Sequence, residues 1–596
     1  MHSMESTPAK AGRAPTRRRV VRVLILSVLL CGSGFAVAGW EARQAAQARG
    51  HLLHAATLFD GLQSQLAAGS FAAASTTVTA MRRETAAAKE RTGDLAWRLG
   101  GHAPAVGDDV RAVRTVTSAL DDLAAGVLPS LVNVAARIEA LAPRGGVVDL
   151  AALSDAASEL GAAEVTLRRI RDRISAISTG HLVGPLAAPI AELDGQLSRA
   201  VELIGSALRA AKLIAPMLGA SGPRTYLALF QNPAEVRATG GMPGAYLVIE
   251  ADRGVIRVVD DGMASGGLAI SNVPVLALNP EMTALYGTAI GRYPANINQT
   301  PDFPTVARLA REMYRRHSGR TVDGVLATDP VALSYLLGAT GPVVVPGGPE
   351  LRADNAVHVL LSDVYAGSRS RPQQDAYFRT VAHATFAALS RRPIPARPML
   401  AQLARAAGER RLLAWSARPD EQRLLAGTVL EGVLPQDRPQ APTVGVFLND
   451  GGGGKMSYYL RPAARLGDTG CKLAGRSVLK LRLTLSSTAP AKGLSPYVRN
   501  SAAALDPYTI RTHVSVFSPT GGSVIEARLD GVGSPFKAGS EGRRAVGIIS
   551  VDLAPGTSRR LEVTLLADSG TVEAARLWTT PTISPWRIEH PPAGRC

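Results

Sequence analysis

One polar segment, residues 231–246, concentrates the side chains best able to do chemistry. Its sequence, QNPAEVRATGGMPGAY, places a carboxylate and a guanidinium between two apolar runs, TYLALF and AYLVIE. A guanidinium is a planar fork that suits phosphate or carboxylate, and adjacent glycines let a backbone approach a ligand closely. We therefore predict a ligand-binding loop formed by Asn232, Glu235, Arg237, Gly240 and Gly241. In the structural alternative, Glu235 pairs with Arg237, Asn232 caps a turn and the glycines serve a bend.

A second polar group lies at residues 369–379, where a basic loop leads into an expected helix. Arg371 and Arg379 flank a Gln-Gln-Asp run there. A helix N-terminus preceded by arginines can bind phosphate through backbone N–H groups and guanidinium ions. We predict that Arg371 and Arg379 contact an anionic ligand, with a solvated charged turn as the alternative.

Asp302 is the candidate metal ligand of this chain. It stands in the motif DFP, directly before an expected helix, and could ligate a cation or act as a base. The alternative is capping of the helix at Thr305, which fits an Asp followed by a proline in the first helical turn. The ten histidines show no metal-ligand spacing.

Several catalytic motifs are absent from the sequence. It contains neither G-x-S-x-G nor H-E-x-x-H, which disfavours serine hydrolase and zinc protease chemistry. The run GGGGK at 451–455 lacks the glycine spacing and the Ser or Thr of a P-loop, because Met456 follows Lys455. We predict a glycine-rich hairpin at this run.

The N-terminus predicts a membrane anchor. A basic tail, residues 1–22, precedes an apolar run at 23–40 that is long enough to cross a bilayer. The basic flank places the N-terminus in the cytoplasm and the bulk of the chain outside it. A cleaved signal peptide is the alternative, because AVAGW resembles a small-residue cleavage site.

Cysteine usage agrees with an extracytoplasmic location. Of three cysteines, Cys31 falls in the apolar run, which leaves Cys471 and Cys596. An even pair in an oxidising compartment predicts one disulfide between them.

The formal net charge of +17 favours an anionic partner such as lipid head groups or a phosphate-rich envelope polymer. The alternative is a compositional bias toward Arg that serves no partner. Nucleic acid is not expected on this side of a membrane.

The chain then divides by its hydrophobic pattern into a multidomain α+β protein. Residues 41–218 repeat apolar side chains every three or four positions, which predicts a helical bundle or stalk. Residues 222–395 alternate strand-like and helix-like segments, which predicts a central α/β domain. Residues 396–440 look like a small α/β connector. Residues 441–596 alternate apolar and polar positions, which predicts a C-terminal antiparallel β-sandwich.

The segment YLALFQNPAEVRATGGMPGAYLVIEADRGVIRVVD resembles the family called domain of unknown function 4012, which occurs in bacterial membrane-anchored proteins. VDGVLATDPVALSYLLGATGPV (322–343) and GVFLNDGGGGKMSYYL (445–460) are similar to that family as well. The resemblance implies architecture and location and little about mechanism.

The order of strands and polar segments in the central domain is also similar to the LytR-CpsA-Psr phosphotransferases. Those enzymes attach polyprenyl-pyrophosphate-linked glycopolymers to the cell wall. The resemblance implies that Arg237, Arg371 and Arg379 face a pyrophosphate and that an acidic residue holds Mg²⁺. This chain has GMPGAY where that family has Arg-Ser-Asp-Thr, so the resemblance favours binding over catalysis.

These observations predict a single-pass cell-envelope protein that binds, and could transfer, an anionic lipid-linked glycopolymer. The alternative is a non-enzymatic envelope scaffold with an adhesive β-sandwich. A cluster of Arg237, Arg371 and Arg379 around an apolar cleft would favour the first, and Arg237 buried against Glu235 without an open cleft would favour the second.

Overall fold

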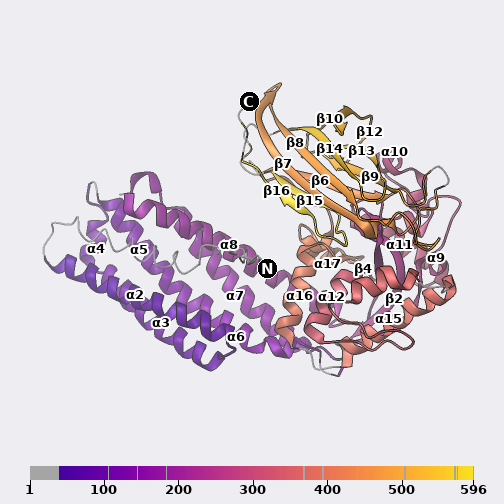
Figure 1. Cartoon of the computed structure of the whole chain (residues 1–596). Coiled ribbons are helices and arrows are strands. Elements are labelled where there is room, and N and C mark those ends of the chain that lie inside the picture. The colour runs from indigo at the N-terminus through magenta and orange to yellow at the C-terminus, as the bar shows by residue number, and fades with distance from the viewer. Residues whose placement is uncertain are drawn as a thin grey trace, which may run out of the picture. The chain divides into compact units, whose positions relative to one another are not determined.

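The computed structural model describes residues 39–104, 106–143, 145–182, 184–366, 370–391, 395–438, 441–502, 505–568, 572, 575–592, 594 and 596. The chain forms two compact units (Figure 1). Unit 1 is the chain up to Leu141 together with Ala151–Ile214, and unit 2 is Ala142–Leu150 together with Ala215–Cys596. The predicted basic tail 1–22 and the predicted span 23–40 lie outside the described residues, apart from Gly39 and Trp40.

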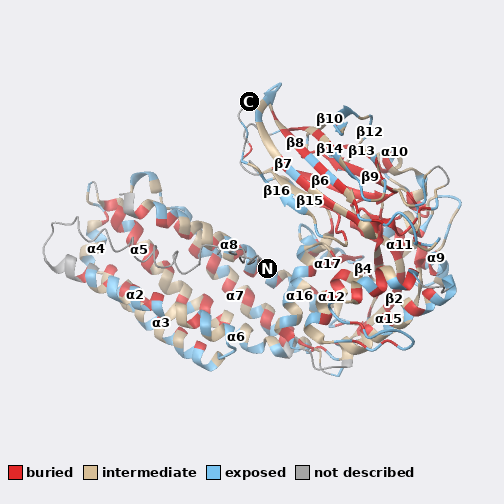
Figure 2. Ribbon diagram, viewed as in Figure 1, coloured by how far each residue is buried: buried red, intermediate tan, exposed pale blue. Residues whose placement is uncertain are grey.

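Unit 1 is built from helices packed along their apolar faces. Its α-helices are α2 (Gly39–Ala67), α3 (Phe71–Thr92), α4 (Leu95–Gly100), α5 (Gly107–Asp122), α6 (Leu128–Arg137), α7 (Leu150–Ser175) and α8 (Gly184–Met217). A π-helical turn, Leu123–Val127, joins α5 to α6. The predicted apolar stripes lie in one hydrophobic cluster, with Val113 from α5, Leu167 from α7 and Val201 from α8. Buried residues accordingly recur along the longer helices in Figure 2, whereas α4 has none.

One helical run among the described residues, Gly107–Arg137, is long and apolar enough to cross a membrane. This property rests on length and composition, and the core helix of a soluble protein can have it too. The run is distinct from the span predicted at residues 23–40.

Unit 2 contains a five-stranded mixed sheet in the order β3-β2-β1-β4-β5. Its strands are β1 (Arg224–Arg237), β2 (Gly240–Asp252), β3 (Val255–Met263), β4 (Gly324–Thr328) and β5 (Leu413–Ser416). Strand β1 pairs in parallel with β4, and the other neighbours are antiparallel. The apolar runs TYLALF, AYLVIE and VIRVV lie in β1, β2 and β3, in agreement with the strand-like segments predicted for residues 222–395.

Helices cover both faces of this sheet. Leu227, Leu229 and Val248 of one face pack on α11 (Phe303–Ser318), whereas Ala228 and Leu247 of the other face pack on α15 (Arg371–Arg391). The remaining helices of this region are α9 (Ala264–Gly267), α10 (Pro280–Tyr286), α12 (Pro330–Thr340), α13 (Ala356–His358), α14 (Val364–Ala366), α16 (Ala396–Gly408) and α17 (Pro419–Leu425). Burial on both faces explains why the strands read as continuous apolar runs.

Two details of the central domain differ from the prediction. The run PVVV (342–345) has the apolar composition of one of the predicted strand-like segments but makes only an isolated bridge, between Val343 and Leu351. The segment predicted as a separate connector supplies β5, which pairs with β4 and completes the central sheet.

The C-terminal part of unit 2 contains two further sheets, in the orders β11-β10-β14-β8-β7-β16 and β12-β13-β9-β6-β15. Their strands are β6 (Thr443–Asp450), β7 (Leu460–Leu473), β8 (Arg476–Ser487), β9 (Ile510–Phe517), β10 (Ser523–Leu529), β11 (Val532–Gly533), β12 (Lys537–Glu541), β13 (Arg544–Leu553), β14 (Ser558–Ala567), β15 (Arg576–Thr579) and β16 (Arg587–Glu589). Leu481 of β8, Val514 of β9 and Val563 of β14 share one hydrophobic cluster that draws on both sheets.

These two sheets are mixed, so the prediction of a wholly antiparallel arrangement is wrong. Strand β15 runs parallel to β6, and β16 runs parallel to β7. Both are short strands at a sheet edge, where the alternating pattern in the sequence is too brief to show direction. A disulfide joins Cys471 of β7 to Cys596, with 4.7 Å between the Cα atoms.

Candidate functional site

The segment predicted as a polar loop is the end of a β-hairpin. Strand β1 continues through Arg237 and pairs with β2, with Val236 opposite Gly241 and Arg237 opposite Gly240. The register shifts between Asn232 and Val236, so the polar residues occupy a β-bulge inside a sheet. These polar side chains, which in the sequence are typical of a loop, make buried contacts in the structure.

Arg237 is enclosed by the protein and does not reach a cavity. Its guanidinium lies 3.2 Å from a carboxylate oxygen of Glu235, and both side chains are buried. Nε donates to the carbonyl oxygen of Ala295 at 3.1 Å, and Nη1 donates to that of Asp450 at 3.4 Å. These contacts are those of the structural alternative, and they correct the predicted ligand role of Arg237.

The two glycines also contact the protein itself. A Cβ on Gly241 would lie 2.1 Å from the backbone carbon of Asn232, so only glycine fits beside the bulge. The N–H of Gly241 donates to Gln231 Oε1 at 3.0 Å, and its carbonyl oxygen accepts from Asn298 Nδ2 at 2.7 Å. Gly240 and Gly241 therefore close the hairpin and are not a ligand cradle, which corrects that prediction.

An apolar cavity of about 480 Å³ lies between the central sheet and α15. Its walls come from β1, β2 and β4 on one side and from α15 on the other, and its mainly apolar lining includes Phe230, Leu247, Ile249, Leu326, Phe378 and Phe386. Small-molecule sites typically measure ~300–1,000 Å³ and are lined mostly by apolar side chains with a few polar groups. The cavity has this size and this lining.

Lys455 supplies a buried cation at one end of this cavity. Its ammonium donates to Glu235 Oε2 and lies 5.8 Å from the ring centre of Tyr365 and 5.5 Å from that of Tyr497. The two rings stack on each other, with centres 5.5 Å apart. Aromatic faces attract a cation, so the lysine is held where it lines the cavity although it is only 6% exposed.

Asn232 connects the bulge to the same end of the cavity. Its Nδ2 donates to the hydroxyl of Tyr365 at 2.6 Å, and its Oδ1 accepts from the N–H of Ala234 at 3.0 Å. Asn232 lines the cavity, and it also stabilises the local turn, as in the structural alternative. Its contact with a ligand stays a prediction.

The structure places the two arginines predicted to contact an anion, Arg371 and Arg379, in different surroundings. Arg371 and Asp375 line the cavity, and burial raises the pKa of Asp375 although Arg371 and Arg379 lower it. Arg379 is not among the lining residues; its Nη1 lies 3.8 Å from a carboxylate oxygen of Asp261. Arg371 thus remains a candidate contact for an anion, and Arg379 does not.

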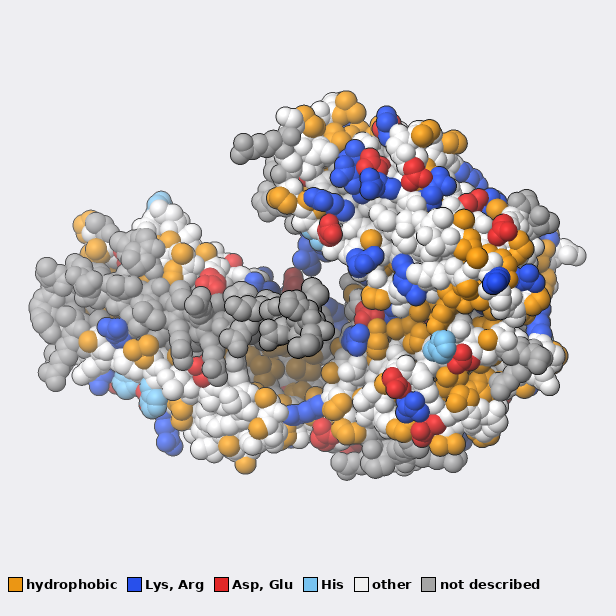
Figure 3. Space-filling view, viewed as in Figure 1, with side chains coloured by type: hydrophobic (Ala, Val, Ile, Leu, Met, Phe, Trp, Pro, Cys, Tyr) orange, Lys and Arg blue, Asp and Glu red, His pale blue; other side chains and the backbone are white. Residues whose placement is uncertain are grey.

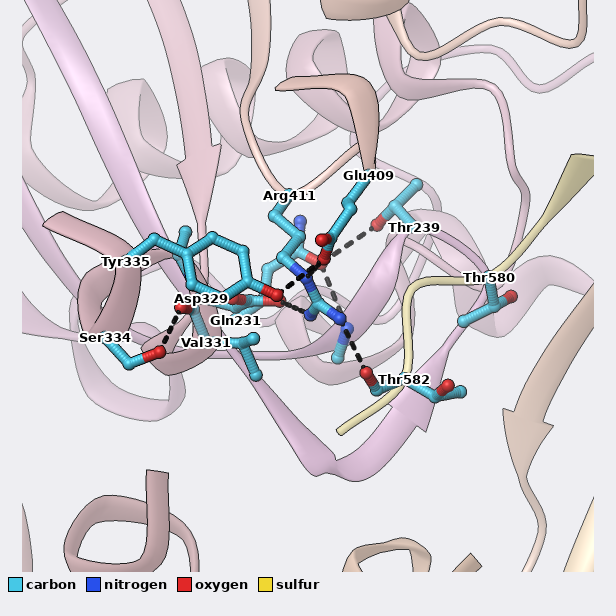
Figure 4. Close-up of polar contacts among 12 residues, drawn as sticks. Gln231, Thr239, Asp329, Val331, Ser334, Tyr335, Glu409, Arg411, Thr580 and Thr582 are labelled. Carbon is cyan, nitrogen blue, oxygen red and sulfur yellow. Dashed lines mark hydrogen bonds and ion pairs between the residues drawn. The ribbon is translucent and has the colours of Figure 1, made fainter. Parts of the chain in front are cut away.

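A buried ion network supports the cavity wall (Figure 4). Arg411 donates to Asp329 Oδ2, to Glu409 Oε2 and to the carbonyl oxygen of Thr582, each at 2.7 Å. Asp329 also accepts from the N–H of Ala332 at 2.8 Å, which caps α12. Asp329 is among the residues that line the cavity, and its carboxylate is bonded to Arg411 and to the N-terminus of α12.

Asp302 occupies the N-cap position of α11, but its side chain does not bond to a backbone N–H of the helix. Its Oδ2 accepts instead from the hydroxyl of Thr305 at 2.5 Å. Within the described part of the chain, no group of three or more His, Cys, Asp or Glu side chains could hold a metal ion. A metal role for Asp302 stays a prediction.

The excess of basic residues is not concentrated at the cavity. In the view of Figure 3, Lys and Arg side chains gather over the C-terminal sheets among Asp and Glu side chains. Lys480 and Arg482 there both pair with Glu562, at 3.3 and 2.8 Å. Local ion pairs therefore offset part, but not all, of the positive charge of this region.

Sequence reasoning missed Lys455, because GGGGK was considered only as a P-loop and then as a hairpin. Residues 451–455 instead form bends between β6 and β7, which belong to different sheets. A Cβ on Gly454 would lie 2.5 Å from the carbonyl oxygen of Arg499. The glycines permit close backbone contacts at this segment, and these contacts place Lys455 at the cavity. Four glycines before a single lysine are therefore the sequence signal for this part of the site.

Residues 221–365 match the family model described as "Protein of unknown function (DUF4012)". No curated protein and no solved structure matches the chain. The matched segment carries β1 to β4, including the bulge and the sheet wall of the cavity, whereas α15 and Lys455 lie beyond it.

Proposed function

Since residues 221–365 carry a domain of the DUF4012 family, we propose that this chain is a single-pass protein of the cell envelope whose unit 2 binds an anionic lipid-linked glycopolymer outside the cytoplasm. The observation that carries this proposal is the apolar cavity with Lys455 in its wall. The apolar part of the lipid enters between the central sheet and α15. The anionic head group lies near Lys455 and Arg371.

Two physical features support this ligand class. Removing an apolar chain from water is favourable by ~25 cal/mol for each Å² buried, and the cavity offers Phe378, Phe386 and Ile249 to receive it. A charge-assisted hydrogen bond from Lys455 would fix the head group, because such bonds are about twice as strong as neutral ones. Polyprenyl pyrophosphate combines both properties.

The finer architecture is part of the same proposal. We take the two C-terminal sheets as a β-sandwich, supported by the hydrophobic cluster to which both contribute, and the central sheet as of the LytR-CpsA-Psr kind. The support for the latter is the order β3-β2-β1-β4-β5 with helices on both faces.

The proposal is for binding without a transfer step. The carboxylates among the cavity-lining residues are Asp329 and Asp375. The first is engaged by Arg411, and the second follows Arg371 on the first turn of α15. No metal enters the proposal.

A non-enzymatic scaffold in the envelope is the second candidate. The observation that favours it is the burial of Arg237 against Glu235, at the contact between the bulge and the segment from Asp450 to Lys455. In that case the ion cluster fixes the central sheet to the C-terminal sheets, and the cavity has no physiological ligand.

Calorimetric titration of the full chain in detergent separates the two candidates. Polyprenyl pyrophosphate, the corresponding polyprenol and inorganic pyrophosphate are the three probes, and Lys455→Met is compared with Lys480→Met on the outer face of β8. We expect the lipid pyrophosphate alone to bind well, and Lys455→Met to weaken it by about 10- to 100-fold, from a lost charged hydrogen bond of ~1.5–3 kcal/mol. If the wild-type chain binds none of the three probes, the ligand proposal is wrong and the scaffold function is favoured.

A further inference from the structure

Helix α4 exposes two large apolar side chains at one end of unit 1. Leu95 and Leu99 are 70% and 65% exposed. They lie four residues apart and therefore share a face of the helix. Trp97, between them in sequence, packs against the hydrophobic core of unit 1, so the helix is fixed while its leucines face outward.

The end of unit 1 that carries α4 is also the end at which the chain enters it. Helices α2 and α3 are antiparallel, because His51 bonds to Glu84 at 2.7 Å while Gln44 bonds to Arg91 at 3.2 Å. Arg91 is in the last turn of α3, and α4 follows at once. Helix α4 therefore lies beside the beginning of α2 (Figure 1).

The sequence before α2 indicates that this end of unit 1 lies next to a membrane. The predicted membrane span ends at Trp40, and Gln44 is four residues further along α2. At 1.5 Å per residue, this is a rise of ~6 Å along the helix axis. A bilayer that contains residues 23–40 would thus have its surface at the level of α4.

We propose that α4 is an interfacial membrane contact, in which Leu95 and Leu99 insert among the lipid head groups and acyl chain ends. Apolar side chains on one face of a surface helix bind a membrane in this way. Arg98, exposed between them, can reach anionic head groups. The contact gives unit 1 a second attachment beside the anchor and limits its tilt. The inference rests on the membrane anchor of the proposed function and not on its ligand.

The test uses collision accessibility of a spin label on the full chain in lipid nanodiscs of phosphatidylcholine and phosphatidylglycerol. Cys31→Ser removes the cysteine that is not part of the disulfide, and Leu99→Cys provides the attachment site for the label. Leu203→Cys is the matched control, since Leu203 on α8 is also 65% exposed.

At position 99 we expect collisions with a water-soluble nickel chelate to be at least about threefold less frequent than at position 203, and collisions with oxygen to be more frequent, as at a lipid interface. Equal nickel accessibility at both positions would overturn the lipid contact while leaving the anchor intact. Reduced access to both reagents would mark a protein partner on α4 and overturn it too. A chain that fails to assemble with lipid would contradict the anchor and this inference with it.

Discussion

Lys455 and Glu235, 220 residues apart in sequence, form a buried ion pair at one end of the apolar cavity. Glu235 belongs to the bulge of β1, and Lys455 follows the glycine run after β6. Arg237 contacts the other carboxylate oxygen of Glu235. The pair therefore joins the central sheet to the C-terminal sheets and places a cation in the cavity wall at the same time.

The ion pair predicts unequal effects of removing either partner. Glu235→Gln leaves both Arg237 and Lys455 buried without their carboxylate, and breaking buried pairs in this way costs ~3–5 kcal/mol of unfolding free energy. Lys455→Met leaves Glu235 paired with Arg237, so we expect a smaller loss of ~1.5–3 kcal/mol. Urea unfolding of both variants measures the difference. Equal losses would mean that Lys455 alone neutralises Glu235.

Gly241 predicts a steric effect at the bulge. A methyl group there would overlap the backbone of Asn232, and neither backbone can move without breaking the hairpin. We expect Gly241→Ala to lower the free energy of unfolding by more than ~3 kcal/mol, which is at the upper end for point substitutions.

Gly266→Ala is the control for this effect, because nothing lies within 4 Å of a Cβ at that position. Its stability should stay within about 1 kcal/mol of the wild-type chain. If both alanine variants were equally stable, the close approach at the bulge would be wrong.

Glu541 predicts a contribution to the free energy of unfolding that is lost between mildly acidic and neutral pH. Burial raises the pKa of Glu541 to about 7, although the hydroxyls of Thr300 and Tyr286 bond to it and lower it. Its pKa in the unfolded chain is lower, 4.5, so the folded state binds more protons between these values. The stabilisation is therefore present below pH 4.5 and is lost as the pH rises to 7, by about 3 kcal/mol at most.

Thermal or urea unfolding between pH 4.5 and 8, compared for the wild-type chain and Glu541→Gln, measures this effect. Glutamine keeps one donor and one acceptor for the two hydroxyls, so we expect a flatter pH profile and higher stability at pH 8. Asp450, whose pKa is raised by burial to about 6, contributes with the same sign, so part of the slope should remain. If the pH profile of unfolding is unchanged in Glu541→Gln, groups other than Glu541 cause the slope.

The cavity predicts a loss of ligand binding without a loss of fold. Ala382 on α15 faces the cavity, and Ala382→Phe would place a ring in the space assigned to the lipid chain. We expect the affinity for polyprenyl pyrophosphate to fall at least about tenfold, which is ~1.4 kcal/mol. Because Ala382 packs with Ala228 and Leu247, the larger ring should also lower the unfolding free energy by ~1–3 kcal/mol, which urea unfolding measures and which leaves the chain folded. Undiminished affinity in this variant would remove the lipid chain from this cavity.

Local patterns in the sequence were enough to predict most elements of the fold. The apolar run TYLALF became the core of β1, the alternation from Leu479 to Leu485 became β8, and the stripe in α7 became part of a helical core. In each case the pattern repeats with the period of its own secondary structure. The short parallel strands β15 and β16 have too few residues for such a pattern.

The site was less predictable, because its contacts are distant in sequence. Glu235 and Arg237 are polar neighbours, and only their pairing with β2 and with the segment around Asp450 shows that they are buried. Lys455 is held by Glu235, which lies 220 residues away in the sequence. No local pattern encodes such a contact.

Photocrosslinking with a benzophenone-bearing polyprenyl pyrophosphate tests the central claim most directly. The full chain is irradiated with the probe, and the labelled peptides are identified by mass spectrometry, with excess unlabelled lipid as competitor. We predict competed labelling on β2 around Leu247 and on α15 around Phe378 and Phe386, which face each other across the cavity. Labelling that avoids both segments, or that the unlabelled lipid does not reduce, would contradict the proposed lipid site.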